Sequence, residues 1–370
     1  MLLIDNPTVE KVLAMQDCLR IQEEAFLGLA TGASVHRPRV DVYVPTDKEE
    51  DGYWRWGTME GASKDLGVFA IRMKSDVITW PRHEDGTWTE EKYCVEPGTY
   101  CGLIMLFSTR NGEPLAIIND GHLQHARVGG GAGLGAKYLA REDAQVVGMI
   151  GSGGMARSYL RAFKCVRDIR KVRVYSPTPA NREAYAQEMA KELGIEVEPV
   201  ASAEEAVRGA DIVSTCTDSN LPVIQAEWLE PGMHITNLGG AELPEGVFSR
   251  ADLVVRQGVG GLPVPEGNER IQAGRGHSPA AYIAGSEEEM KRLPPASGRQ
   301  WFSAGRYPSF VELATGEVKR TNRDQITLYL NGGNQGLQFA AVGALVYNKC
   351  REQELGRPLP TEWFLQDIRD

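Results

Sequence analysis

The sequence predicts an α/β protein in which a doubly wound parallel sheet is inserted into a mainly antiparallel α+β domain. In the middle of the chain, short apolar runs typical of buried parallel strands alternate with helical segments. Between residues 35 and 125, short alternating runs separated by turn clusters favour antiparallel strands. A chain of 370 residues is long enough for about two domains.

The central units follow one another in a regular order. Strands are expected at residues 145–150, 171–175, 195–200, 211–215, 234–237 and 253–256, and helices at 157–167, 181–193 and 203–208. Gly194 is placed to end the second helix, because glycine accepts the left-handed conformation common there. Ser202 is placed to cap the third. This β-α-β alternation predicts a doubly wound sheet.

The flanking regions are expected to form the antiparallel part. Strands are expected at residues 40–44, 67–73, 100–108 and 115–118, and amphipathic helices at 9–28 and 338–352. Asn111-Gly112 between the last two strands predicts a β-hairpin.

These patterns predict a discontinuous outer domain. Residues 1–126 and 325–370 are expected to form it, around an inserted domain at 127–324. Residues 257–310, which are rich in Gly, Pro and charged residues, are interpreted as a long surface excursion of the inserted domain.

The composition narrows the classes of function. The 50 acidic residues outnumber the 40 basic ones, so the formal net charge is −10, which argues against a nucleic-acid or anionic-membrane partner. No apolar run approaches the ~18 residues of a transmembrane helix, and the N-terminus lacks the pattern of a secretory signal. Six cysteines without C-x-x-C spacing indicate reduced thiols. We therefore expect a cytoplasmic protein.

A glycine-rich turn carries the clearest functional signal. It fits G-x-G-x-x-G/A with the residues Gly151, Ser152, Gly153, Gly154, Met155 and Ala156. Glycines allow a tight turn and close approach of a pyrophosphate, and the small residue lets the helix pack on the strand. Because a strand precedes and a helix follows, the motif predicts a Rossmann dinucleotide-binding domain rather than an ordinary glycine turn.

The end of the second strand indicates which dinucleotide is bound. NAD sites place an acidic residue there to hold the ribose 2′-hydroxyl. This chain has Ser176, Thr178 and Arg182, and no acid before Glu183. Two hydroxyls and a guanidinium suit a 2′-phosphate, so NADP(H) is favoured over NAD(H), although Arg182 also fits a solvated helix position.

Further cofactor contacts are expected from the carboxyl ends of later strands, where open α/β sheets bind ligands. The candidates are Thr217, Asn237 and Gly239. Ordinary turn chemistry explains the same residues equally well.

The segment before the glycine turn resembles the ornithine cyclodeaminase/μ-crystallin family. Arg127, the small residues at 129–136 and Lys137-Tyr138-Leu139-Ala140 keep the spacing of that family's stretch before its Rossmann strand. The small residues predict a closely packed helix with Arg127 near its N-terminus. The resemblance extends to Gly112–Ala116, to Glu242-Leu243 with 250–253, and to 324–328.

The resemblance implies an activity and an assembly. It implies an NAD(P)-dependent oxidoreductase that transfers a hydride to or from the α-carbon of an imino, ketimine or amino acid. It also implies a homodimer built by the antiparallel domain. Arg127 would hold the substrate carboxylate with its planar fork, and Arg39 would contact it as well. Lys74, which shares a strand face with Arg72, would bind substrate and polarise the imine or carry its proton. A surface arginine and a strand-end lysine are the alternative interpretations.

One departure from the family pattern bears on the activity. Cyclodeaminases carry Gly-Gly-Asp before Glu-Leu, whereas this chain has Gly239-Gly240-Ala241 before Glu242. The missing Asp argues against the first alternative, an ammonia lyase of the ornithine cyclodeaminase type. The second alternative is a non-catalytic NADP or small-ligand binding protein of the μ-crystallin type. The run 331–336 is expected either to line the nicotinamide pocket or to form a flexible turn.

No metal site is expected. His122 and His125 form an H-x-x-H pair, but neither a cysteine nor an H-E-x-x-H pattern accompanies them.

Overall fold

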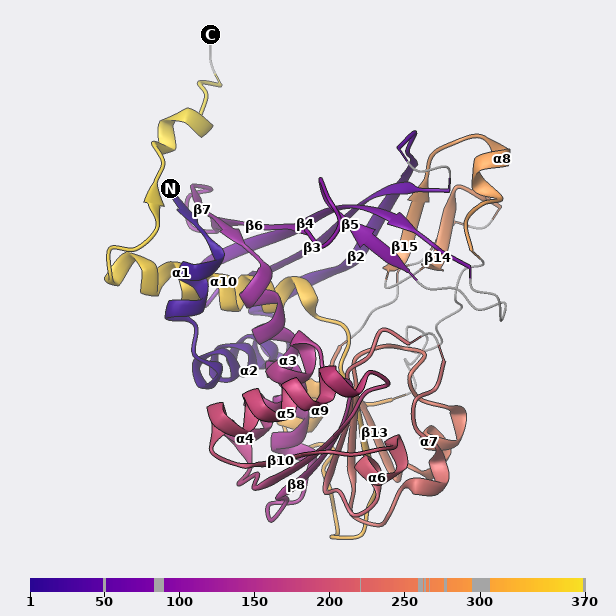
Figure 1. Ribbon diagram of the computed structural model, residues 1–370. Coiled ribbons are helices and arrows are strands. Elements are labelled where there is room, and N and C mark those ends of the chain that lie inside the picture. Colours follow the sequence, from indigo (N-terminus) through magenta and orange to yellow (C-terminus); the bar gives the residue numbers. More distant parts are fainter. Residues whose placement is uncertain are drawn as a thin grey trace.

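The structure is a computed structural model. It describes residues 1–48, 51–82, 90–219, 221–258, 262, 264–265, 267–275, 278–294 and 307–368. These residues form two sheets, one above the other in Figure 1, with helices α2, α3 and α10 between them. The helices are α1 (Asn6–Val12), α2 (Met15–Thr31), α3 (Gly121–Leu139), α4 (Gly154–Val166), α5 (Pro179–Leu193), α6 (Ala203–Val207), α7 (Glu245–Arg250), α8 (Glu287–Met290), α9 (Phe310–Ala314) and α10 (Gln335–Glu352).

The upper sheet of Figure 1 has ten strands among the described residues. In spatial order they are β14 (Ile271–Arg275), β15 (Ser278–Ile283), β2 (Ser34–Pro45), β3 (Tyr53–Ser63), β4 (Val68–Thr79), β6 (Cys101–Ser108), β7 (Pro114–Asn119), β1 (Leu2–Ile4) and β17 (Arg357–Pro358), with β5 (Glu91–Tyr93) paired to β4. The run from β2 to β7 is antiparallel. Helix α10 packs on one face of these strands.

The lower sheet is parallel throughout the part of the chain that the structure describes. Its order is β10 (Glu196–Pro199), β9 (Lys171–Tyr175), β8 (Val146–Ile150), β11 (Ile212–Thr215), β12 (His234–Asn237), β16 (Thr327–Leu330) and β13 (Leu253–Arg256). The predicted α/β fold with a Rossmann domain and an antiparallel domain is confirmed. The expected central strands and helices are present, and their ends differ by at most three residues.

Two local predictions have clear outcomes. The hairpin at Asn111-Gly112 is confirmed, and Gly112 adopts φ 78°, as its turn requires. The single helix expected at 9–28 is instead two helices. The Asp5 side chain caps α1 by accepting a hydrogen bond from Thr8 N. The chain is extended at Leu13 before α2 begins.

The expected domain limits do not follow the sheets. Strand β16 lies after residue 325, yet all four of its residues are buried between β12 and β13 in the parallel sheet. Its four residues suffice for a buried strand, but so short a run cannot be recognised by periodicity. Within the expected surface excursion, β14 and β15 pair in antiparallel fashion and extend the ten-stranded sheet through β2.

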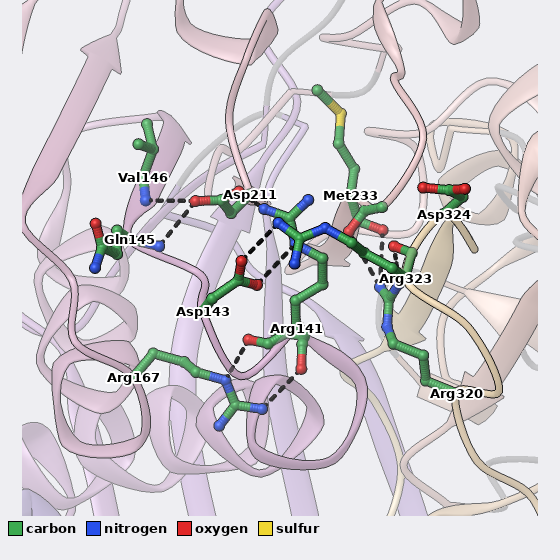
Figure 2. Close-up of polar contacts among 12 residues, drawn as sticks. Arg141, Asp143, Gln145, Val146, Arg167, Asp211, Met233, Arg320, Arg323 and Asp324 are labelled. Carbon is green, nitrogen blue, oxygen red and sulfur yellow. Dashed lines mark hydrogen bonds and ion pairs between the residues drawn. The ribbon is translucent and has the colours of Figure 1, made fainter.

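Helix α3 begins at Gly121, six residues before Arg127, so Arg127 lies in its second turn rather than near an N-terminus. Its glycines allow the predicted close packing, since a Cβ at Gly129 would lie 2.6 Å from the Ser158 carbonyl oxygen of α4. Arginines satisfy the carbonyls at its C-terminus. Arg320 donates to Leu139 O at 2.7 Å, and Arg167 to Ala140 O at 2.7 Å. Figure 2 shows both arginines near the amino ends of the parallel strands.

None of the described helices combines the length and the apolar character needed to cross a membrane.

Candidate functional site

A cavity of about 360 Å³ lies between the two sheets and draws its walls from both. The antiparallel sheet contributes Arg39, Arg55, Met59, Arg72, Lys74 and Asp76, the segments joining the sheets contribute Gln124, Arg127, Val128, Asn331, Gly332 and Gln335, and the Rossmann domain contributes Met155, Thr217, Asp218, Ser219, Leu238 and Gly239. The cavity thus brings the predicted substrate residues to the carboxyl ends of the parallel strands, where such sheets bind ligands.

Charged residues occupy inward positions on the antiparallel strands, where a core face normally carries apolar ones. Strand β4 alternates buried and half-buried residues, and its buried set includes Arg72, Lys74 and Asp76. Buried charges need partners. Arg55 of β3 donates to both oxygens of Asp76, at 2.9 and 2.6 Å, and Arg39 of β2 forms the same fork with its neighbour Asp41.

Gly57 makes room for this charged row. It lies on β3 between Asp41 on β2 and Lys74 on β4, in register with both. A Cβ at position 57 would lie 2.5 Å from Asp41 Oδ1 and 2.6 Å from Lys74 Cε. Without that glycine the two side chains could not both lie across the strand.

Lys74 has the electrostatics of a proton carrier. Its side chain is 4% exposed, and its Nζ is 3.7 Å from Asp76 Oδ2, longer than a direct hydrogen bond. Burial, followed by the charges of Arg39 and Arg55, holds the pKa of Lys74 well below its usual range. The carboxylates of Asp41 and Asp76 oppose this lowering of the pKa without cancelling it.

Arg127 is a buried guanidinium held by neutral groups. It donates to Gln124 Oε1 at 2.8 and 3.1 Å and to Gln338 Oε1 at 3.0 Å, and it lies 4.9 Å from the ring centre of Phe339. Among the described residues no carboxylate lies within 4.0 Å of it, since no ion pair includes it. Burial, with a further contribution from Arg72, lowers the pKa of Arg127 to about 9. A bound anion would relieve that cost.

Arg72 belongs to a group that the sequence analysis did not assign to the site. It donates to Asp120 Oδ2 at 2.6 Å and to the hydroxyl of Tyr100 at 2.5 Å. Gly102 leaves space for the Asp120 carboxylate. Tyr100 also lines the cavity, so Arg72 connects the wall to the start of α3.

The glycine turn has the geometry of a dinucleotide loop. Gly151 adopts φ 108°, and a Cβ there would collide with the Cys216 carbonyl oxygen, so only glycine fits. A Cβ at Gly153 would meet nothing within 4 Å, which leaves the backbone open to a ligand. Helix α4 begins at Gly154 with free N–H groups suited to a pyrophosphate. Ala156 is fully buried against the sheet, as the motif requires.

The residues expected to choose the cofactor gather at the end of β9. Ser176 Oγ accepts from Ser152 Oγ at 3.0 Å, and Arg182 donates to Ser176 O at 2.8 Å. Thr178 is exposed and precedes α5. Arg157, which sequence reasoning missed, donates to Ser152 O at 2.6 Å and stands beside this group. Its place one residue after the motif was the available signal.

Glu242 joins the loops that follow β11 and β12 by hydrogen bonds from both. Its carboxylate accepts from Thr217 N at 2.6 Å, from Thr215 Oγ1 at 3.0 Å and from Leu238 N at 2.9 Å. Thr217 Oγ1 and Gly239 N are two further donors. Burial raises the pKa of Glu242, and these donors oppose that rise. Asn237 supports the same loop by donating to Gly239 O at 2.9 Å.

The structure brings Arg39, Lys74 and Arg127 into one cavity with Met155, Thr217 and Gly239. Ser176, Thr178, Arg182 and Asn237, which were predicted to contact the cofactor, do not line this cavity. Asp218 is an additional wall residue, and nothing beyond its loop position marked it in the sequence. Of residues 331–336, Asn331, Gly332 and Gln335 line the cavity.

Known proteins resemble the chain over most of its length. A putative dehydrogenase of Rhizobium meliloti is 30% identical over 341 residues, covering 90% of this chain and 91% of that protein. An alanine dehydrogenase of Archaeoglobus fulgidus is 30% identical, covering 69% of this chain and 73% of its own. The solved structure of Thermococcus litoralis Δ1-pyrroline-2-carboxylate reductase with NADH and L-proline is 26% identical. It matches with a TM-score of 0.71 and covers 97% of this chain and 100% of that one.

The model of the ornithine cyclodeaminase/mu-crystallin family matches residues 88–261. That range spans the end of the antiparallel strands, helix α3 and the glycine turn, which are the parts that carry the resemblance. Together with the relatives above, it shows that this chain belongs to the ornithine cyclodeaminase/mu-crystallin family.

Proposed function

We propose that this protein is an NAD(P)-dependent oxidoreductase that transfers a hydride to or from the α-carbon of an imino or amino acid. Arg127 carries the proposal, because a buried guanidinium without a carboxylate partner among the described residues matches a substrate carboxylate. Relatives named alanine dehydrogenase and pyrroline-2-carboxylate reductase act on substrates of this class by name.

Lys74 supplies the proton chemistry of the proposed reaction. When bound, a nicotinamide supplies or accepts the hydride. Oxidation of an amine also releases a proton from nitrogen, and the neutral Nζ of Lys74 accepts it because its pKa is depressed. In the reducing direction the protonated Nζ returns that proton. Arg39 and Arg127 hold the carboxylate so that the nitrogen faces Lys74.

The residues present fit a dinucleotide. Gly151 and Gly153 leave the backbone open at the start of α4, and Met155 reaches the cavity. Preference for NADP(H) follows from Ser176, Thr178 and Arg182 at the end of β9. The comparisons support a nicotinamide cofactor, and the choice of NADP(H) is our inference.

Arg182→Ala tests that choice. Loss of a charge-assisted bond worth roughly 1.5–3 kcal/mol should weaken NADPH binding about 10- to 150-fold and leave NADH binding nearly unchanged. Arg208→Ala is the matched control, because Arg208 pairs with Glu204 on α6, away from the glycine turn. Tighter NADH than NADPH binding by the unmodified protein would contradict the preference.

Among the described residues, Glu242 does not replace the missing Asp of cyclodeaminases as a proton acceptor. Glu242 is the nearest acid in sequence, but its oxygens accept from the loop residues and it does not line the cavity. Glu242 therefore has a supporting role, and a hydride-transfer enzyme with net cofactor turnover is favoured over an ammonia lyase.

We also propose a homodimer that uses the outer face of the ten-stranded sheet. The face opposite α10 carries partly exposed apolar side chains. They include Trp54, Trp56, Phe69, Ile71, Met73, Leu103, Met105 and Phe107. An apolar surface of this extent is typical of subunit contacts. Sedimentation should give twice the chain mass of 40.6 kDa, and a monomer at micromolar concentration would refute this.

One experiment separates the proposed oxidoreductase from its alternatives. NADPH and NADH oxidation is followed against cyclic imines and against 2-oxo acids supplied with ammonium or methylamine. We expect stoichiometric cofactor oxidation with at least one imino acid. Ammonia release from ornithine without net cofactor change would indicate a lyase, and cofactor binding without either reaction would indicate a binding protein.

A further inference from the structure

The last described residues form an apolar segment that the proposed reaction does not use. After β17 the chain passes through the 3-10 turn Thr361–Phe364 and continues to Ile368. In Figure 1 this yellow segment runs past the N-terminus, away from the parallel sheet, and stands clear of the rest of the molecule.

The side chains of this segment meet solvent instead of a core. Trp363 is 73% exposed, Leu365 is 60% exposed and Ile368 is 92% exposed, and Phe364 is also exposed. Single exposed apolar residues are ordinary, but four within six residues concentrate apolar surface of the kind that marks a contact site.

The start of the segment is fixed. Leu359 N donates to Met1 O at 2.9 Å, and the N-terminal ammonium donates to Thr361 Oγ1 at 2.8 Å. Strand β17 also pairs with β1. The apolar side chains are therefore presented from an anchored base, which lowers the entropy lost when they pack on a partner.

The position of the base indicates the partner. Strand β17 is the edge strand of the ten-stranded sheet, whose outer face is the proposed dimer surface. The segment therefore leaves the body from the edge of the sheet that carries that surface, separated from β6 by β7 and β1. Between residues 360 and 368 the charged residues are Glu362 and Asp367, both acidic. Two negative charges disfavour an anionic lipid surface.

We propose that residues 360–368 form an arm that packs against a second copy of this chain. This inference rests on the proposed homodimer. In a two-fold dimer each subunit extends one arm over the other, so the contact is made twice. The apolar side chains Trp363 and Leu365 are its anchors.

Sedimentation at several concentrations tests the arm with Trp363→Ala and Leu365→Ala. Each should raise the dimer dissociation constant about tenfold or more, because large apolar anchors dominate interfaces. Leu221→Ala is the matched control, since Leu221 is 61% exposed on a loop after β11. It should change the constant less than about twofold. If the native dimer is too tight to dissociate, the rate of subunit exchange between labelled dimers replaces the constant.

The outcomes separate the arm from the dimer. A dimeric native chain whose dissociation constant is unchanged in both arm variants overturns the arm and leaves the dimer standing. A monomeric native chain overturns both. Binding of the native chain to phosphatidylserine vesicles that is lost in Trp363→Ala would replace the second copy with a membrane. Melting temperatures measured for each variant show whether the subunit still folds.

Discussion

Replacing Arg127 by lysine tests the central assignment of the site. The change keeps the positive charge but removes the planar fork. In the structure one edge of the guanidinium serves Gln124 and another serves Gln338. A lysine at this position would have one ammonium to divide among these amides and a substrate.

The size of the effect follows from the bonds lost. A charge-assisted hydrogen bond contributes roughly 1.5–3 kcal/mol. Losing one of the two hydrogen bonds from Arg127 to the substrate carboxylate, with poorer alignment of the other, should cost about 2–4 kcal/mol. This corresponds to roughly a 30- to 1000-fold lower kcat/KM. Cofactor affinity should hardly change, because the pyrophosphate is expected to bind the glycine turn and the N-terminus of α4 rather than Arg127.

The assay is steady-state kinetics on the best imino acid, together with cofactor titration. Arg167→Lys is the matched control, because Arg167 donates to the carbonyls of Arg141 and Ala140 near the amino ends of the parallel strands, whereas the cavity lies at their carboxyl ends (Figure 2). It should lower the melting temperature without lowering kcat/KM. An unchanged kcat/KM in Arg127→Lys, or an equal loss of cofactor affinity, would refute the assignment.

Three further variants probe the rest of the site. In Lys74→Arg the side chain stays charged, so amino-acid oxidation should fall about 100-fold or more. The rise of the native rate with pH, set by a lysine pKa below its usual range, should disappear from the pH profile, and a surviving rise would assign it to another group. Gly57→Ala should displace the Lys74 amine and lower kcat/KM, whereas Gly343→Ala, whose Cβ would have only contacts of 3.7 Å or more, should not. Glu242→Gln leaves loop N–H groups unsatisfied and should weaken cofactor binding about 5- to 150-fold, and unchanged titration curves would show that the loops do not depend on it.

The depressed pKa of Lys74 also makes the free energy of unfolding depend on pH, and the direction of this dependence follows from the shift. The folded state binds this proton less tightly than the unfolded chain, whose lysine titrates near ~10.4. The free energy of unfolding contributed by Lys74 therefore rises with pH between the two pKa values. Relative to Lys74→Met, the native protein should be least stable at low pH.

The sequence predicted much of the fold because its parallel strands are local, self-contained units. Each is a short apolar run bounded by a turn, and the glycine turn adds a motif with its own geometry. Strand β16 escaped this reasoning since its pairing with β12 and β13 joins residues 93 and 74 positions apart, which no local pattern encodes. The pair β14 and β15 escaped the same reasoning because β15 pairs with the distant strand β2.

The cavity was harder to predict than the fold because several of its contacts join residues of different elements. Alternation alone placed Arg72 and Lys74 on one face of β4, and it would have placed Asp76 there too. It could not show that Arg55 on β3 forms an ion pair with Asp76, nor that Gly57 makes room for Lys74. Strand β3 itself was not among the expected strands. Those facts depend on strand register, which is set by the whole sheet.

The ion pairs decide which arginine is left for a ligand. Four arginines line the cavity, and three of them have carboxylate partners: Arg39 with Asp41, Arg55 with Asp76, and Arg72 with Asp120. Each of these pairs is buried, so breaking one to hold a substrate would leave an uncompensated charge and cost several kcal/mol. Arg127 has only amide oxygens and an aromatic ring to lose. A single substrate carboxylate therefore binds at Arg127 without breaking an ion pair, while Arg39 contributes from a guanidinium already oriented by Asp41.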